Sequence, residues 1–192
     1  MPNSATIAAD KMNVVYRGVK NPMTITFAGV SSDKISASAP GLNKLGNGKY
    51  VMEPTSGSEV VIKVNGSLPG GQPVSDQAKF RIKDLPKPTG EFLGKTDGIK
   101  LPKANISVGE VKAIFEDFDF DLPLGVTSFK VSVPGQASVN VNGSRMDARA
   151  KAAIAKARRG DMIQIFDIKA KPTNGSTVRI KTVSPILIEV QN

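Results

Sequence analysis

The chain has 192 residues and carries 26 Lys and Arg against 17 Asp and Glu, a formal charge of +9 at neutral pH. Histidine and cysteine are both absent, which excludes histidine base catalysis, cysteine nucleophiles, disulfides and the usual zinc sites. The positive balance leaves nucleic acid, an anionic membrane surface or an acidic protein as possible partners. The excess is +4 in residues 1–86 and +5 in residues 87–192. No basic tail or apolar run of about 18 residues is visible, so neither a nucleic-acid arm nor a membrane span is expected.

Residues 1–86 contain four runs in which apolar and polar residues alternate, a pattern that predicts strands with one buried face. The runs cover residues 23–27, 35–39, 60–64 and 79–83. Turn residues separate them, at Pro40-Gly41, Asn47-Gly48, Asn65-Gly66 and Pro69-Gly70-Gly71. Short strands with such spacing favour an antiparallel β-sandwich.

Pro86-Lys87-Pro88 ends this half, because two prolines in three residues stiffen a linker and stop a strand. We place the boundary between a spacer domain, 1–86, and a C-terminal domain, 87–192. Strands are expected at 115–122, 129–133, 137–141, 162–168, 178–182 and 186–190. The predicted fold is mainly β: two consecutive Ig-like β-sandwich domains, the second with one short α-helix between strands.

That helix is expected at about 145–159, with Ser144 and Asp147 as a capping box and Gly160 at its C-terminal end. A period of 3.6 residues places one apolar stripe toward the core, formed by Met146, Ala150, Ala153, Ile154 and Ala157. It gathers four cations on another face: Arg145, Arg149, Lys156 and Arg159. These four are the candidate partner-binding residues, and the alternative is an ordinary solvated face.

Other motifs favour structural interpretations. On the predicted strand 115–122, Asp117, Asp119 and Asp121 share a solvated face, although a metal site remains an alternative and paired carboxylates also serve glycosidases. Gly94-Lys95-Thr96 lacks the earlier glycine of a P-loop, which favours a turn. The Asn-Gly-Ser triplets at Asn65, Asn142 and Asn174 match glycosylation acceptors but favour turns. We expect no catalytic, cofactor-binding or metal-binding residues and no cofactor.

Seven short segments stand out along the chain: AADKMNVVYRGV at 8–19, GKY at 48–50, FRIKDLP at 80–86, FDFDL at 118–122, RRGD at 158–161, QIFDIKA at 164–170 and VSP at 183–185. In this order, and over nearly the whole chain, they resemble the GldM/PorM family of gliding motility and type IX secretion proteins.

The resemblance implies a homodimeric periplasmic shaft, anchored in the inner membrane by an N-terminal helix that this chain lacks. That missing part would join GldL/PorL in a proton-driven motor. The C-terminal domain would reach the outer-membrane-associated ring of GldK/PorK and GldN/PorN. The implied role is structural and force-transmitting, without catalysis or a small-molecule substrate.

Two other function classes stay open. The charge alone suggests nucleic-acid binding, but the aromatic residues sit mostly at core positions instead of alternating with cations, so we expect no nucleic-acid partner. The alternative to the shaft is a secreted carbohydrate-binding or adhesive β-sandwich.

Overall fold

A computed structural model describes residues 5–9, 13–118 and 120–192 of the chain. Contacts divide the chain into two compact units, Met1–Leu85 and Pro86–Asn192. The boundary expected from the prolines lies one residue away from this division. Each unit has its own hydrophobic core, and each is described by itself below.

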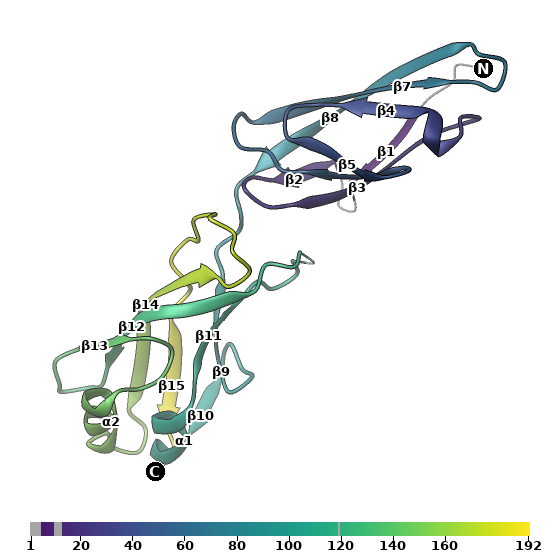
Figure 1. Ribbon diagram of the computed structural model, residues 1–192. Helices are drawn as coiled ribbons and strands as arrows, with labels where there is room; N and C mark the ends of the chain where they lie inside the picture. Colours follow the sequence, from purple (N-terminus) through teal and green to yellow (C-terminus); the bar gives the residue numbers. More distant parts are fainter. Residues whose placement is uncertain (1–4, 10–12, 119) are drawn as a thin grey trace. The chain divides into compact units, whose positions relative to one another are not determined.

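The described residues of the first unit form eight strands and one turn of 3-10 helix (Figure 1). The strands are β1 (Ala5–Ala9), β2 (Val14–Tyr16), β3 (Asn21–Phe27), β4 (Ile35–Ser38), β5 (Leu42–Gly46), β6 (Lys49–Met52), β7 (Glu59–Ser67) and β8 (Pro73–Lys83). They form two four-stranded sheets, in the orders β1-β3-β6-β5 and β2-β8-β7-β4. All pairs are antiparallel except that of β2 with β8, which is parallel.

This topology is that of an immunoglobulin-like sandwich. If β1 and β2 are two parts of a first strand that switches sheets, the orders correspond to the ABED and CFG sheets of that fold. The expected alternation is confirmed where it was clearest: Met23, Ile25 and Phe27 of β3 are buried, and so are the inward residues of β7. The expected turn at Asn65-Gly66 is wrong, because both residues lie inside β7 and the chain reverses at Leu68–Gln72 instead.

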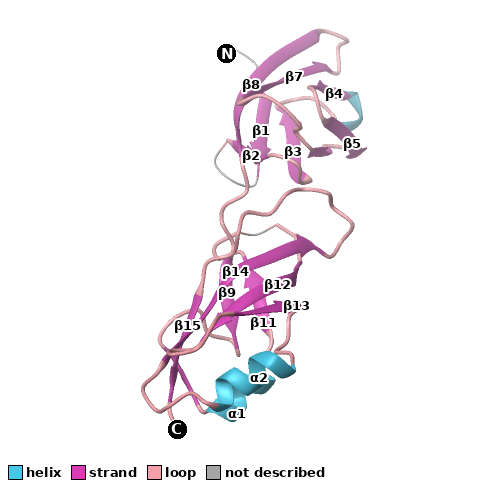
Figure 2. Ribbon diagram, turned by 90° about the vertical axis from the view of Figure 1, so that its left-hand side faces the viewer, coloured by secondary structure: helices cyan, strands magenta, loops and turns pink. Residues whose placement is uncertain are grey.

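In the second unit, the residues that the structure describes form seven strands and two helices (Figures 1 and 2). They are β9 (Thr89–Phe92), β10 (Ile99–Leu101), α1 (Lys103–Val108), β11 (Val111–Ile114), β12 (Leu124–Ser132), β13 (Val139–Asn142), α2 (Ala148–Ala155), β14 (Met162–Pro172) and β15 (Ile186–Val190). A five-stranded sheet has the order β10-β15-β14-β12-β13, and β11 pairs with β9 in a two-stranded sheet. The first strand again switches sheets, since β9 lies in one sheet and β10 runs parallel to β15 in the other.

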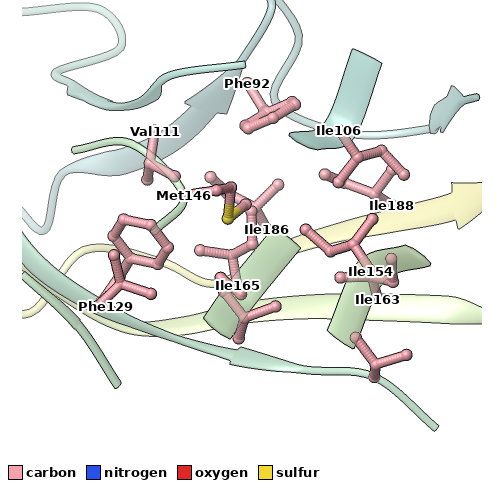
Figure 3. Packing of buried hydrophobic residues seen from close by; sticks show 14 of the residues in the cluster. Phe92, Ile106, Val111, Phe129, Met146, Ile154, Ile163, Ile165, Ile186 and Ile188 are labelled. Atoms are coloured by element: carbon pink, nitrogen blue, oxygen red, sulfur yellow. The ribbon is translucent and has the colours of Figure 1, made fainter. Parts of the chain in front are cut away.

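The core of the second unit lies between the two sheets and the helices. Figure 3 shows Phe92 and Val111 from the small sheet facing Ile165 and Ile186 from the large one, with Ile106 and Ile154 from the two helices beside them. The mainly β class and the two sandwich units are therefore confirmed, and α2 lies between β13 and β14 as expected. The six-residue α1 was not predicted.

The predicted strand at 115–122 is wrong. The described part of this segment is turn and irregular structure, and Asp117 has φ of +53°, which a strand does not allow. The ring of Phe118 lies 4.9 Å from that of Phe115 and 4.6 Å from that of Phe120 between centroids. The phenylalanines therefore pack on one another instead of forming the inner face of a strand. Asp119 lies outside the described residues.

The strand predicted at 178–182 is also missing, because this segment has no strand beside it among the described residues. Only Val183, one residue further, forms a bridge, with Ile168 of β14. Among the described residues, no helix is long and apolar enough to cross a bilayer.

Candidate docking surface

The helix expected at about 145–159 is half that length. It covers Ala148–Ala155, and Asp147 caps it by accepting a 2.8 Å hydrogen bond from the amide of Ala150. The capping box is wrong, because the Ser144 hydroxyl bonds to the Glu110 carboxylate at 3.0 Å. The predicted apolar stripe is confirmed, since all five of its residues are buried: Met146, Ala150, Ala153, Ile154 and Ala157.

The four candidate cations do not share one helix face. Arg145 precedes α2 and pairs as an isolated bridge with Glu110, whose carboxylate lies 3.2 Å from the Arg145 guanidinium. A second nitrogen of Arg145 donates to the Val108 carbonyl at 3.3 Å. Arg145 is therefore bonded within the unit and is the weakest docking candidate of the four.

The other three are spread from the first turn of the helix to the turn that follows it. Arg149 is exposed on α2, Lys156 is the C-cap residue, and Arg159 lies in a turn that leads into β14. Gly160 does not end the helix, as it was expected to do. It adopts φ of +87° in that turn, and its amide donates to the Val190 carbonyl at 2.8 Å.

Further cations that the sequence pattern missed lie around the same place. Lys151 and Arg158 are exposed, and Lys103 of α1 donates from Nζ to the Ala157 carbonyl at 3.1 Å. We call α1, α2 and residues 156–161 the helical end of the unit (Figure 2). A contact between two helices distant in sequence was needed to place Lys103 there, so periodicity within one helix could not find it.

The acids of the helical end are already engaged. Asp147 caps α2, and Asp161 accepts from the Arg158 amide at 2.8 Å. Within the part of the chain that the structure describes, the side chains of five cations make no ion pair: Arg149, Lys151, Lys156, Arg158 and Arg159. Uncompensated exposed charge of one sign favours an acidic partner over an internal structural role.

Two grooves lie elsewhere on the same unit, each with a volume of about 500 Å³. The first runs between β11 and the start of β12 and is lined by Phe115, Phe118 and Phe120 among others. The second lies between the end of β14 and residues 176–182 and includes Lys169, Lys171 and Arg179. The sequence pattern indicated neither groove.

The motifs tested for chemistry adopt structural roles. Leu93 and Gly94, both with positive φ, form a tight turn closed by two hydrogen bonds between Phe92 and Lys95, which is the turn expected in place of a P-loop. Among the described residues, no three Asp or Glu side chains gather to hold a metal ion.

Comparisons with solved structures return distant β-rich proteins. The fibronectin(III)-like modules of Clostridium thermocellum CbhA share 13% identity over 97% of this chain and 94% of theirs, with a TM-score of 0.35. The EC1-2 fragment of human mucin-like protocadherin shares 16% identity over 97% of each chain, with a TM-score of 0.29. No functional conclusion follows from likeness at this level. No curated protein matches the chain.

Family models give the specific result. The model of the GldM third domain matches residues 4–83, and that of the GldM C-terminal domain matches residues 86–191. The two matches follow the two structural units and stand in the order in which the resemblance of the sequence segments placed them. The chain belongs to the GldM family of gliding motility and type IX secretion proteins.

Proposed function

We propose that the chain is a non-enzymatic adaptor that transmits force from an inner-membrane motor to the outer-membrane-associated ring. One observation carries this proposal: in both units the first part of the chain pairs in parallel with the last strand, β2 with β8 and β10 with β15. When the two ends of such a unit are pulled apart, parallel terminal strands must slide past each other. All hydrogen bonds between them then bear the load together instead of opening one by one.

Ion pairs reinforce both terminal pairings. In the first unit, the Arg17 guanidinium lies 2.9 Å from the Asp84 carboxylate and also donates to the Gly57 carbonyl at 2.8 Å. In the second, Lys100 of β10 and Glu189 of β15 are paired at 3.5 Å. Exposed pairs add little to equilibrium stability, but these two connect the strands that would carry tension.

The compartment and partners follow from family membership as proposals. The proposal places the protein in the periplasm as a homodimer that is anchored in the inner membrane and forms a motor with GldL/PorL. Docking to the GldK/PorK and GldN/PorN ring is assigned to the second unit, through Arg149, Lys156 and Arg159 of the helical end. No nucleic acid or small-molecule substrate is part of this role.

The mechanical part is tested by stretching the full chain from both ends at constant speed. We expect Arg17→Ala to lower the unfolding force of the first unit and to leave that of the second unchanged. Lys20→Ala, at an exposed position without an ion pair among the described residues, is the control. Equal unfolding forces for Arg17→Ala and the wild type would contradict the role of this ion pair. Unfolding forces near zero for both units would contradict force transmission.

The docking part is tested by binding of the full chain to a reconstituted GldK/GldN ring at low and moderate salt. Reversing Arg149, Lys156 and Arg159 to Glu should weaken binding about tenfold or more, and most strongly at low salt. A control with the same change in net charge reverses Lys20, Lys44 and Lys63, which are exposed in the first unit. Equal weakening by both variants would assign the effect to overall charge and remove docking from the helical end.

A further inference from the structure

The groove between the end of β14 and residues 176–182 is basic and partly apolar. Among the residues that line it are Lys169, Lys171 and Arg179, with Val178 and Ile180 half-buried between them and no acidic residue. Lys181, exposed, lies in the same segment. These four cations form no ion pair with any residue that the structure describes. A charge of this density without local compensation favours an anionic occupant.

The backbone beside the groove is free to pair. The loop between β14 and β15, visible in Figure 1, contains residues 177–182, and within the described structure none of their amides donates to a backbone carbonyl. Val178 donates only to the Ser176 hydroxyl, at 3.3 Å. Backbone groups without a hydrogen-bond partner can pair with another chain that adds a strand.

Side-chain exposure alternates along residues 177–181 as it does in a strand. Thr177, Arg179 and Lys181 are exposed, whereas Val178 and Ile180 are half-buried. The sequence predicted a strand at 178–182, and residues 177–181 keep the alternating exposure of one without a strand beside them among the described residues. A strand added at this edge would place its alternate residues about 7 Å apart on each face.

We propose that this groove binds an extended acidic segment of a partner protein by strand addition. Backbone groups of residues 177–182 would pair with the segment, whose carboxylates would meet Lys169, Lys171 and Arg179. Its intervening apolar residues would contact Val178 and Ile180. The occupant is a peptide and not a structureless polyanion, because the groove offers unpaired backbone and apolar contacts together with charge. This surface is separate in sequence from the helical end; the inference rests on the proposed adaptor role and adds a second contact to it.

The test uses the full chain and a labelled ten-residue peptide in which Glu and Val alternate between terminal Ser residues. A scrambled peptide of the same composition, with its Glu residues contiguous, controls for charge. We expect the alternating peptide to bind at least about tenfold more tightly in fluorescence anisotropy. Reversal of Lys169, Lys171 and Arg179 to Glu should weaken that binding about tenfold. The helical-end variant, Arg149, Lys156 and Arg159 to Glu, should bind the peptide as the wild type does.

Amide hydrogen exchange on the wild type makes the test independent of how well the variants fold. Residues 177–182 should exchange fast in the free chain and become protected when the alternating peptide is added. Slow exchange before addition, equal binding of both peptides, or equal loss in the helical-end variant would each overturn the proposal. If the chain binds the ring but not the alternating peptide, the groove proposal is refuted and the adaptor role stands. If the chain binds the alternating peptide but not the ring, docking at the helical end is refuted and the groove proposal stands.

Discussion

Asn21 is the residue whose replacement tests the structure of the first unit most directly. It is 2% exposed and lies where the chain leaves β2 in one sheet and enters β3 in the other. Its side-chain oxygen accepts from the Tyr16 amide at 2.8 Å, and its nitrogen lies 2.9 Å from the carbonyls of Tyr16, Val19 and Met52. An amide group has two hydrogens, so at least one of them is shared between two carbonyls.

Asn21→Ala would remove this partner from the Tyr16 amide and from the carbonyls of Tyr16, Val19 and Met52. The asparagine amide accepts one hydrogen bond and has two hydrogens to donate, so about three hydrogen bonds are lost. At about 1 kcal/mol for each, the first unit should lose about 3 kcal/mol of its free energy of unfolding. For a domain of this size, that corresponds to a fall of about 12–24 °C in melting temperature. Asn21→Asp should cost at least as much, because a carboxylate there would face carbonyl oxygens.

Differential scanning calorimetry of the full chain provides the measurement, with the transition of the second unit as an internal reference. Asn43→Ala is the matched control, because Asn43 is exposed on β5 and makes no side-chain hydrogen bond with another described residue. A shift of less than about 2 °C in Asn21→Ala would refute the reasoning, since it would mean that water or a rearranged chain satisfies these groups without cost.

Three further predictions concern single contacts. Gly90→Ala should destabilise the second unit by about 1–3 kcal/mol in denaturant unfolding, because its Cβ would lie 2.6 Å from the Ser184 carbonyl oxygen and from Cγ1 of Ile186. Gly46→Ala is the control, because a Cβ there meets nothing within 4 Å. Asp147→Ala should cost about 1 kcal/mol through loss of the α2 cap, and Asp147→Asn should recover most of it. Tyr50→Phe should be neutral or stabilise the first unit by about 1 kcal/mol, because the buried hydroxyl has no hydrogen-bond partner among the described residues. Burial also raises the pKa of Tyr50 and outweighs the Ala37 backbone, which lowers it. The unfolded tyrosine therefore ionises first, stability falls as pH rises above about 10, and titration of unfolding against pH should show a smaller fall in Tyr50→Phe.

Strands in which buried apolar residues alternate with exposed residues could be predicted from the sequence. In β7, the apolar residues Val60, Ile62 and Val64 alternate with exposed neighbours, and all three are buried. β15 was predicted at its observed bounds for the same reason. The apolar stripe of α2 was also predictable, because a buried helix face depends on spacing within one short segment.

Features that depend on distant partners could not be read in this way. The segment 178–182 has the alternation of a strand but no neighbour among the described residues, and strand formation requires both. The acidic run was interpreted as a strand because Phe118 and Phe120 alternate with acids, yet their rings pack together and Asp117 turns the chain. Arg145 pairs with Glu110 instead of lying on the predicted cationic face. The two residues are 35 positions apart in sequence, so periodicity within one helix cannot predict this contact.

The candidate docking surface in the structure therefore contains other residues than the sequence predicted, but it is still positively charged. The helical period groups cations by their angle around the helix axis. It therefore placed Arg145 on the same face as Arg149 and left Lys151 and Arg158 out of that face. The structure ranks them by whether an acid already compensates each one, and this criterion retains Arg149, Lys156 and Arg159 and removes Arg145. Compensation decides the matter because a cation that is already paired must lose one partner to gain another, which leaves little net free energy for docking. Reversing Arg145 alone should therefore affect the stability of the second unit more than its binding to the ring, whereas reversing Arg149 alone should do the opposite.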